Sequence, residues 1–179
     1  MLAFDLETLG PDVEKHDITC AAVYDPDAAV ERYFIFKPPR DDPEEFMALL
    51  DQADRLCAFN GARFDIPLIQ RCFRATPERV ERWRLKLHDV FEASKLALDI
   101  TFSLQSLLDL NRIPGKTGSG GDAVLMALNG QIEDLGAYCL NDTKRTHQVS
   151  SLSRILLPKT RDMFMDPTGG FHVRAPVDV

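Results

Sequence analysis

The sequence begins with a short segment, Leu2–Thr8, that is apolar at nearly every position except Asp5 and Glu7. Such a run predicts a β-strand that is buried on both faces. Side chains alternate along a strand, so the two carboxylates project from one face, ~7 Å apart along the strand. Two uncompensated carboxylates there would cost on the order of several kcal/mol in desolvation and mutual repulsion. Divalent metal ions are the simplest compensation, and the segment therefore constrains the fold to one that brings cations to a buried strand.

A third acid, Asp65, lies where one predicted element changes into another. The apolar segment Arg55–Phe59 predicts a strand, and the spacing of apolar residues in Asp65–Ala75 predicts a helix. A carboxylate at the mouth of a strand-to-helix turn, beside a strand that carries two more, is typical of a site for hard cations. A helix cap is the simpler interpretation of Asp65, because aspartate is favoured at that position.

A fourth acid uses helical spacing. Tyr138 and Asp142 are four residues apart within the predicted helix Ile132–Ile155, so their side chains share one face. A phenol and a carboxylate are therefore expected to point into one site. Taken singly, Asp142 is equally well explained as an acid on a helix surface, and Tyr138 as an aromatic residue of the core.

The remaining pattern predicts an α/β fold. Early strands followed by alternating helices and strands indicate a mixed sheet with helices on its faces. Asp89 precedes one of these helices, and we interpret it as a helix cap rather than as a metal ligand. Strands are predicted over Ile18–Tyr24, Arg32–Lys37 and Leu85–His88, and helices over Pro43–Gln52, Val90–Leu98 and Ser103–Leu110.

The three acidic segments together resemble the motifs of the DEDD 3′-to-5′ exonucleases. They read D-x-E-T from Asp5, N-x-x-x-F-D from Asn60 and Y-x-x-x-D from Tyr138, in that order. The tyrosine is typical of the DEDDy branch, and the chain looks most like stand-alone domains related to the proofreading domain of B-family DNA polymerases. The resemblance runs from Leu2 to about Ile155. It implies a ribonuclease H-like fold with a central mixed five-stranded sheet flanked by helices.

The resemblance also implies a role for each motif residue. Asp5, Glu7 and Asp142 are expected to hold one metal ion, and Asp5 also to contact a second, which Asp65 supports. Tyr138 matches the residue that orients the attacking water. Two Mg²⁺ or Mn²⁺ ions about 3.5–4 Å apart stabilise both the attacking and the leaving oxygen of a phosphodiester. The implied activity is removal of nucleoside 5′-monophosphates from the 3′ end of single-stranded DNA or RNA.

Four further residues are candidates for substrate binding. Thr8 and Leu9 match positions that touch the terminal nucleotide in this family, with Leu9 as an apolar wedge against a base. Asn60 either contacts substrate or fixes its turn. Lys116 lies in a Gly-rich loop, 114–121, which is either a substrate contact or a plain linker.

Two other functions are compatible with these residues. A metal-dependent endonuclease on the same fold is possible because carboxylates alone do not dictate recognition of an end. The other is a non-catalytic nucleic-acid-binding accessory module. A protein without chemistry has no reason to keep charges on a buried strand, which speaks against this module.

Length and charge bound the organisation of the chain. The 179 residues suffice for one well-packed domain, which we predict over 1–157, followed by an extended or disordered tail, 158–179, that docks a protein partner. The net charge of −7 argues mildly against nucleic-acid binding, although two divalent cations would leave about −3. Six basic residues crowd positions 71–86 and form either a local positive strip or a solvated helix face.

Composition also bears on the compartment. No stretch approaches the ~20 apolar residues of a membrane span, and no basic segment precedes the first strand. We therefore expect a cytoplasmic protein without a membrane partner. The cysteines, at positions 20, 57, 72 and 139, lack paired spacing and are interpreted as reduced core residues rather than as a zinc site or a disulfide framework.

Overall fold

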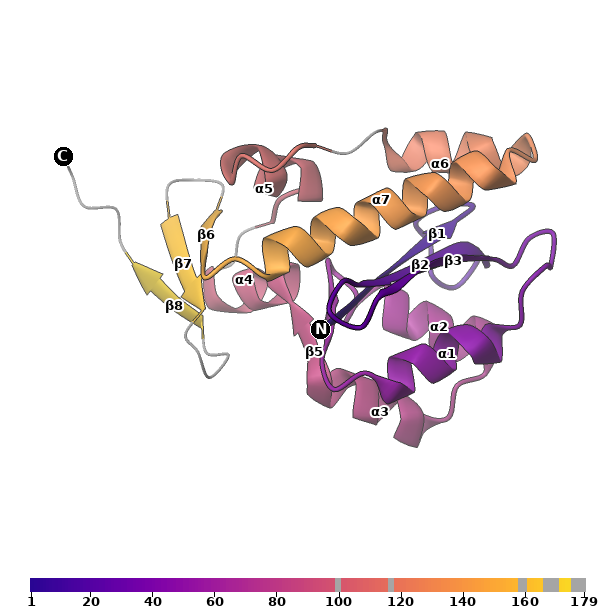
Figure 1. Cartoon of the computed structure of the whole chain (residues 1–179), viewed down its shortest axis with the longest axis horizontal. Coiled ribbons are helices and arrows are strands. Elements are labelled where there is room, and N and C mark those ends of the chain that lie inside the picture. Colours follow the sequence, from indigo (N-terminus) through magenta and orange to yellow (C-terminus); the bar gives the residue numbers. More distant parts are fainter. Residues whose placement is uncertain (99–100, 116–117, 158–160, 166–170, 175–179) are drawn as a thin grey trace.

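The computed structural model of the chain describes residues 1–98, 101–115, 118–157, 161–165 and 171–174. A five-stranded sheet lies at its centre, with helices packed on both faces (Figure 1). The predicted α/β architecture with a mixed central sheet is therefore confirmed.

The strand that carries the first two acids lies in the middle of this sheet. The strand order is β3-β2-β1-β4-β5; β1 pairs antiparallel with β2 and parallel with β4, and β4 pairs parallel with β5. A central position explains why nearly every residue of β1 is buried, on both faces of the sheet. The strands are β1 Leu2–Thr8, β2 Ile18–Asp25, β3 Val30–Ile35, β4 Leu56–Ala58 and β5 Leu87–Asp89.

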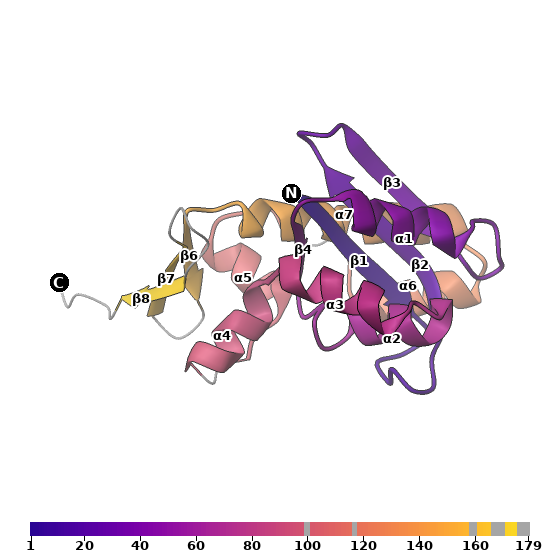
Figure 2. The ribbon, with the colours of Figure 1, turned by 90° about the horizontal axis from the view of Figure 1, so that it is seen from below.

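The helices form two layers around the sheet. Helices α1, α2 and α3 cover one face, and α6 and α7 cover the other, as the two views in Figures 1 and 2 agree. Helices α4 and α5 lie toward the end of the molecule that carries β6. The bounds are α1 Pro43–Gln52, α2 Asp65–Phe73, α3 Pro77–Lys86, α4 Val90–Leu98, α5 Leu104–Leu110, α6 Gly120–Leu128 and α7 Ile132–Ser150.

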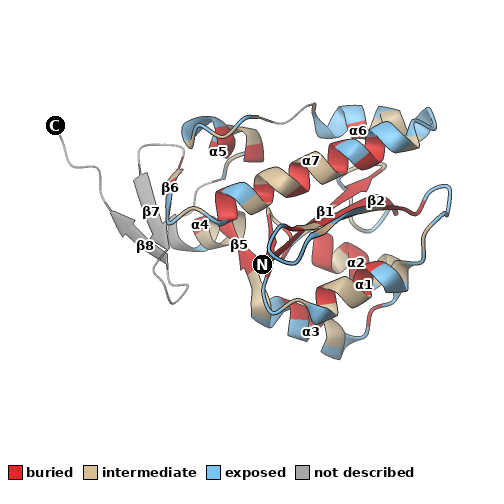
Figure 3. Cartoon of the chain, in the orientation of Figure 1, coloured by how far each residue is buried: buried red, intermediate tan, exposed pale blue. Residues whose placement is uncertain are grey.

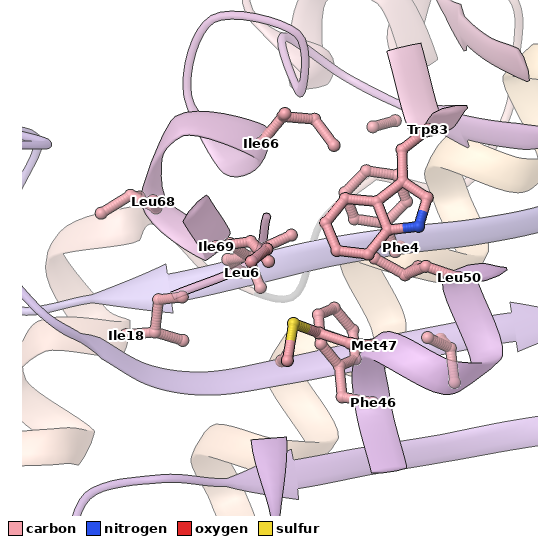
Figure 4. Packing of buried hydrophobic residues seen from close by; sticks show 14 of the residues in the cluster. Phe4, Leu6, Ile18, Phe46, Met47, Leu50, Ile66, Leu68, Ile69 and Trp83 are labelled. Carbon is pink, nitrogen blue, oxygen red and sulfur yellow. The ribbon is translucent and has the colours of Figure 1, made fainter. Parts of the chain in front are cut away.

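Alternation along β1 divides its side chains between the two layers. Phe4 and Leu6 belong to the main apolar core, together with Trp83 of α3 and Phe46 of α1 (Figure 4). A smaller cluster on the opposite face joins β2 and β3 to α6 and α7. Figure 3 shows α7 buried along the side that faces the sheet. The acids of β1 therefore point toward α7.

The predicted end of the last helix is wrong. Helix α7 ends at Ser150 rather than at Ile155, and Arg154–Leu157 forms a strand, β6. The Asn111 side chain makes two hydrogen bonds with the backbone of this strand, as a neighbouring strand would. Asn111 Nδ2 donates to the carbonyl of Leu156 at 2.9 Å, and the Leu156 N–H donates to Asn111 Oδ1 at 2.8 Å. Ile155 is buried in a third apolar cluster. Tertiary packing thus converts an apolar run into a strand.

Two helices were not assigned bounds from the sequence, although a solvated helix face was one interpretation of the basic stretch 71–86. Helix α3 occupies the basic stretch; the Thr76 hydroxyl caps it, and Pro77 occupies its first turn. Arg79 is paired with Glu44 and Asp51, so this side chain is committed to an ion-pair network rather than to a free positive strip. Helix α6 begins at Gly120, inside the predicted loop 114–121, because Ser119 and Asp122 form a capping box.

Smaller differences concern the ends of elements. Strand β5 begins two residues later than predicted, because α3 continues to Lys86. Helix α2 ends at Phe73 rather than at Ala75, because Arg74 adopts the left-handed conformation with φ of 57°. Beyond β6, the strands β7, Arg161–Met165, and β8, Phe171–Arg174, complete a three-stranded antiparallel sheet. The domain division at residue 157 and a partner for the tail stay predictions.

Two expectations about composition can be compared with the structure. All four cysteines are free, and three of them are buried, as expected for reduced core residues. Among the helices that the structure describes, none combines the length and apolar character needed to cross a membrane.

Candidate metal centre

The carboxylates of Asp5 and Glu7 lie together on the α7 side of β1. One carboxylate oxygen of each and the Sγ of Cys139 all lie within 4.8 Å of one another. The Cys139 thiol donates to the backbone carbonyl of Asp5 at 3.5 Å. This contact between α7 and β1 places the middle of the long helix directly over the two acids.

Helix α7 contributes the next two side chains to the same place. Tyr138 is 4% exposed and Asp142 is 2% exposed. The pKa of Tyr138 is raised by burial first, and then by the negative charges of Asp142, Glu7 and Asp5. Asp142 has the largest of these electrostatic effects, so its carboxylate lies close to the phenol. Tyr138 therefore lies near the two acids of β1 and the acid of its own helix, and its hydroxyl stays protonated at neutral pH.

Asp65 joins the group from the first turn of α2. Its carboxyl is 2% exposed, and its pKa is raised by burial first and then by the charges of Asp5 and Asp89. Its Oδ1 is buried and has no hydrogen-bond partner within the described part of the chain. A buried carboxylate oxygen without a donor is costly, so its presence calls for a compensating group such as a cation.

The simpler interpretations of these residues do not account for their positions. Asp142 is not a surface acid, because it is almost fully buried. Asp65 does not cap α2, because no side-chain hydrogen bond caps that helix. Tyr138 does belong to an apolar cluster, but its phenol also contacts Asp142. Each of these three residues thus contributes a polar group to one buried centre.

The donor set fits hard divalent cations. Four carboxylates come from three separate segments, on β1, α2 and α7, and three of them are almost fully buried: Glu7, Asp65 and Asp142. Carboxylate oxygens suit Mg²⁺ and Mn²⁺. Like charges held this close raise one another's pKa values unless cations offset them. The group is therefore the candidate metal centre of the chain.

Asp89 caps helix α4, as predicted, and it also binds the backbone of the turn that follows β4. It accepts from the N–H of Glu92 in α4 at 3.1 Å, and also from the N–H groups of Asn60 at 3.0 Å and Ala62 at 2.9 Å. Asn60 has a φ of +66°, in the left-handed region that asparagine tolerates better than most residues. At Asn60, the structure therefore favours the interpretation that the residue fixes the turn.

The other substrate candidates differ in what surrounds them. The Thr8 hydroxyl donates to the carbonyl of Gly10 at 2.5 Å and accepts from the Gly10 N–H at 3.3 Å, so a local turn already engages it. Leu9 is partly exposed next to this turn. Lys116 lies outside the residues that the structure describes, and both interpretations of it stay predictions.

A cavity of about 350 Å³ opens beside Glu7. Its walls are mainly apolar and include Phe64 from the turn before α2 and Gly121 and Val124 from α6. A Cβ added at Gly121 would approach only the Ser119 hydroxyl, at 3.5 Å, so this glycine borders open space. The α6 part of this wall was not predicted from the sequence, because helix α6 itself was not predicted. Of the three wall residues named here, only Phe64 belongs to one of the sequence motifs, the second.

Comparisons with known proteins agree with this arrangement. A model of the RNase H superfamily matches residues 2–113, a range that includes Asp5, Glu7 and Asp65 and ends before Tyr138 and Asp142. The structure of the family B DNA polymerase from the hyperthermophilic archaeon Pyrobaculum calidifontis is similar over 82% of this chain, with a TM-score of 0.63 and 18% sequence identity. At this identity the similarity shows a shared fold, and it covers 23% of the polymerase chain.

No curated protein sequence matches the chain. The family model alone spans more than half of the 179 residues and includes all five strands of the central sheet. The mixed five-stranded central sheet is the architecture that the resemblance implied, and the structure adds the strand order with β1 at its centre. The chain belongs to the RNase H superfamily.

Proposed function

We propose that this chain is a metal-dependent 3′-to-5′ exonuclease that hydrolyses single-stranded nucleic acid to nucleoside 5′-monophosphates. The observation that carries the proposal is the meeting of Asp5, Glu7, Asp65, Tyr138 and Asp142 at one buried centre. These residues come from three separated segments, and they are the residues that the DEDDy motifs contain. Assignment to that branch rests on the motifs and on Tyr138.

Two divalent cations, Mg²⁺ or Mn²⁺, fit the four carboxylates. Asp5, Glu7 and Asp142 would hold one of them, and Asp5 with Asp65 would hold the other. When bound, such ions neutralise charge on the phosphate and lower the pKa of a bound water. The raised pKa of Asp65 in the metal-free protein is consistent with this role, because a cation removes the repulsion from Asp5 that contributes to it.

Tyr138 positions water rather than accepting its proton. Its raised pKa keeps the phenol protonated, so the oxygen offers one O–H donor and lone pairs at a fixed place among the acids. A general base needs a pKa near the working pH, and Tyr138 is far from that condition. Asp142, one helical turn away, is the charge that acts most strongly on the phenol.

The cavity beside Glu7 suits the terminal nucleotide. Its apolar walls offer a surface for a base, and a nucleotide bound there would have its phosphate near Glu7. Thr8 lines this cavity and Leu9 follows it in the chain, which supports their proposed contact with the last nucleotide. The substrate class is a single-stranded DNA or RNA 3′ end. Binding is expected to weaken with salt because the contacts to the backbone are electrostatic.

The direct test is a denaturing-gel time course with 5′-labelled DNA and RNA oligonucleotides in Mg²⁺ or Mn²⁺. We expect a ladder that shortens from the 3′ end and is abolished in Asp5→Ala. The RNA and DNA lanes give the preferred sugar. Intact substrate in every lane would contradict the proposal and favour a non-catalytic binding module.

A circular single strand separates the two nuclease functions. An exonuclease cannot open a circle, whereas a metal-dependent endonuclease on this fold can. We expect the circle to stay intact under conditions in which the linear oligonucleotide is degraded. Linearisation of the circle that disappears in Asp5→Ala would assign the endonuclease instead.

A further inference from the structure

Asp89 lies outside the three acidic segments, yet its carboxylate is buried close to the metal centre. It is the last residue of β5 and pairs in register with Ala58, the last residue of β4. The chain leaves β4 at this point and turns toward α2, which begins with Asp65. Because neighbouring parallel strands end at the same edge of the sheet, a side chain at the end of β5 can reach the turn that follows β4.

The Asp89 carboxylate holds that turn by its backbone. Oδ1 accepts from the N–H of Asn60 at 3.0 Å and from that of Glu92 at 3.1 Å, and Oδ2 accepts from the N–H of Ala62 at 2.9 Å. Both oxygens are therefore committed, and the side chain is only 7% exposed. Three charge-assisted hydrogen bonds offset part of the desolvation of this carboxylate, although burial still raises the pKa of Asp89.

The turn is tight and continues directly into α2. The N–H groups of Arg63 and Phe64 both donate to the carbonyl of Asn60, at 3.2 and 3.0 Å, and the N–H of Ile66 donates to the carbonyl of Gly61 at 2.9 Å. A Cβ added at Gly61 would come within 2.5 Å of Ala58 Cβ, so the turn also packs closely on β4. A shift of the turn must therefore move the start of α2, and Asp65 with it.

We propose that Asp89 is a positioning residue of the metal centre, which fixes the turn 60–64 so that Asp65 presents its buried oxygen to a cation. The inference rests on the proposed function, because it assigns Asp65 to that centre. It adds a residue that none of the three motifs includes. Asp89 acts through the backbone of the turn and touches neither cation nor substrate.

Asp89→Asn is the informative substitution. It keeps the size of the side chain but replaces one acceptor oxygen with an NH₂ donor. In either orientation, that donor faces a backbone N–H that Asp89 now satisfies. The turn then loses at least one hydrogen bond while α4 and β5 keep their packing. Asp42→Asn is a matched control, since Asp42 caps α1 by accepting from the N–H of Glu44 at 2.9 Å, away from the metal centre.

The readout is Mn²⁺ affinity, measured without substrate from the EPR signal of free Mn²⁺. Loss of a residue that orients a ligand typically weakens metal binding by about 10–100-fold, and we expect a change of about tenfold in Asp89→Asn and none in Asp42→Asn. Faster amide hydrogen exchange at Asn60 and Ala62 in the metal-free variant should accompany it. The exchange measurement also shows that the variant is folded elsewhere.

The outcomes separate this inference from the function on which it rests. Wild-type Mn²⁺ affinity in folded Asp89→Asn would overturn the positioning role and leave the proposed nuclease intact. An equal loss in both variants would also overturn it, since the effect would then be general. A wild-type protein that binds no Mn²⁺ would refute the proposed metal centre itself, and the role of Asp89 with it.

Discussion

The two faces of strand β1 carry opposite chemistry. Phe4 and Leu6 point into an apolar core with α1, α2 and α3, where Trp83 is fully buried (Figure 4). Asp5 and Glu7, which directly follow Phe4 and Leu6 in the chain, point the other way, toward α7 and Asp142. The difference shows how the folded state tolerates carboxylates that repel one another. Burial of apolar side chains on one face stabilises the sheet, and the charged side chains are confined to the other face. Substitutions on the two faces should therefore separate stability from activity.

The largest expected effect lies on the acidic face. Asp142→Asn keeps the volume of the buried side chain and removes its charge, so we expect kcat to fall by about 10³-fold, because electrostatic stabilisation of the reacting phosphate is lost. Single-turnover kinetics at saturating Mg²⁺ measures this fall. Unfolding in EDTA should show no loss of stability. Near wild-type turnover in the folded variant would remove Asp142 from the centre.

The apolar face should show the reverse. Trp83 is fully buried and its Nε1 donates to Asp51 at 2.8 Å, so Trp83→Ala should lower the free energy of unfolding by about 3–5 kcal/mol. Urea denaturation measures the change, and Mn²⁺ affinity below the unfolding transition should be unaltered. Leu85→Ala in the same helix is the control: Leu85 is 79% exposed, and we expect a change within about 0.5 kcal/mol. A Trp83 variant as stable as the control would contradict the comparison.

A substitution at Gly136 is expected to affect both stability and activity. A Cβ at Gly136 would come within 2.4 Å of the Tyr33 ring of β3, so in Gly136→Ala either this ring or α7 must move. We expect a loss of about 1–3 kcal/mol in stability, together with reduced kcat, because α7 carries Tyr138 and Asp142. Thermal unfolding and the oligonucleotide assay report the two changes. Gly120→Ala, where a Cβ meets nothing within 4 Å, should alter neither property.

The smallest effect concerns pH in the absence of cations. The pKa of Asp65 is raised above its ordinary value of 3.8 by burial, Asp5 and Asp89, so the folded state binds this proton more tightly than the unfolded chain does. Its contribution therefore favours folding at acid pH and is lost as pH rises from near 3.8 through the raised pKa. Urea denaturation in EDTA across this range should show that decline.

Asp65→Asn isolates the contribution of this one carboxyl. The difference in stability between wild type and variant should grow in favour of the variant as pH rises, and saturating Mg²⁺ should reverse it, because cations bind the ionised wild-type site. A difference that stays constant with pH would show that Asp65 titrates alike in the folded and unfolded states.

Much of the fold was predictable because local patterns agreed with the tertiary structure. The strand Leu2–Thr8 and the helix Pro43–Gln52 were predicted with the bounds that the structure has. The failures have definite causes. The helix at Gly120 begins with residues that favour loops, and the capping box Ser119–Asp122 offsets this preference. The strand at Arg154–Leu157 forms only because Asn111 and an apolar cluster meet it there.

The amino-acid sequence by itself determined which chemistry is possible. Acids on a buried strand, at a strand-to-helix turn and one helical turn from a tyrosine are properties of residue type and spacing, which follow from the periods of strand and helix. Only the tertiary structure decided that these groups meet, that Phe64 and α6 form a cavity beside Glu7, and that Asp89 holds the turn before Asp65. Those relations join segments far apart in the chain, and no local period encodes them.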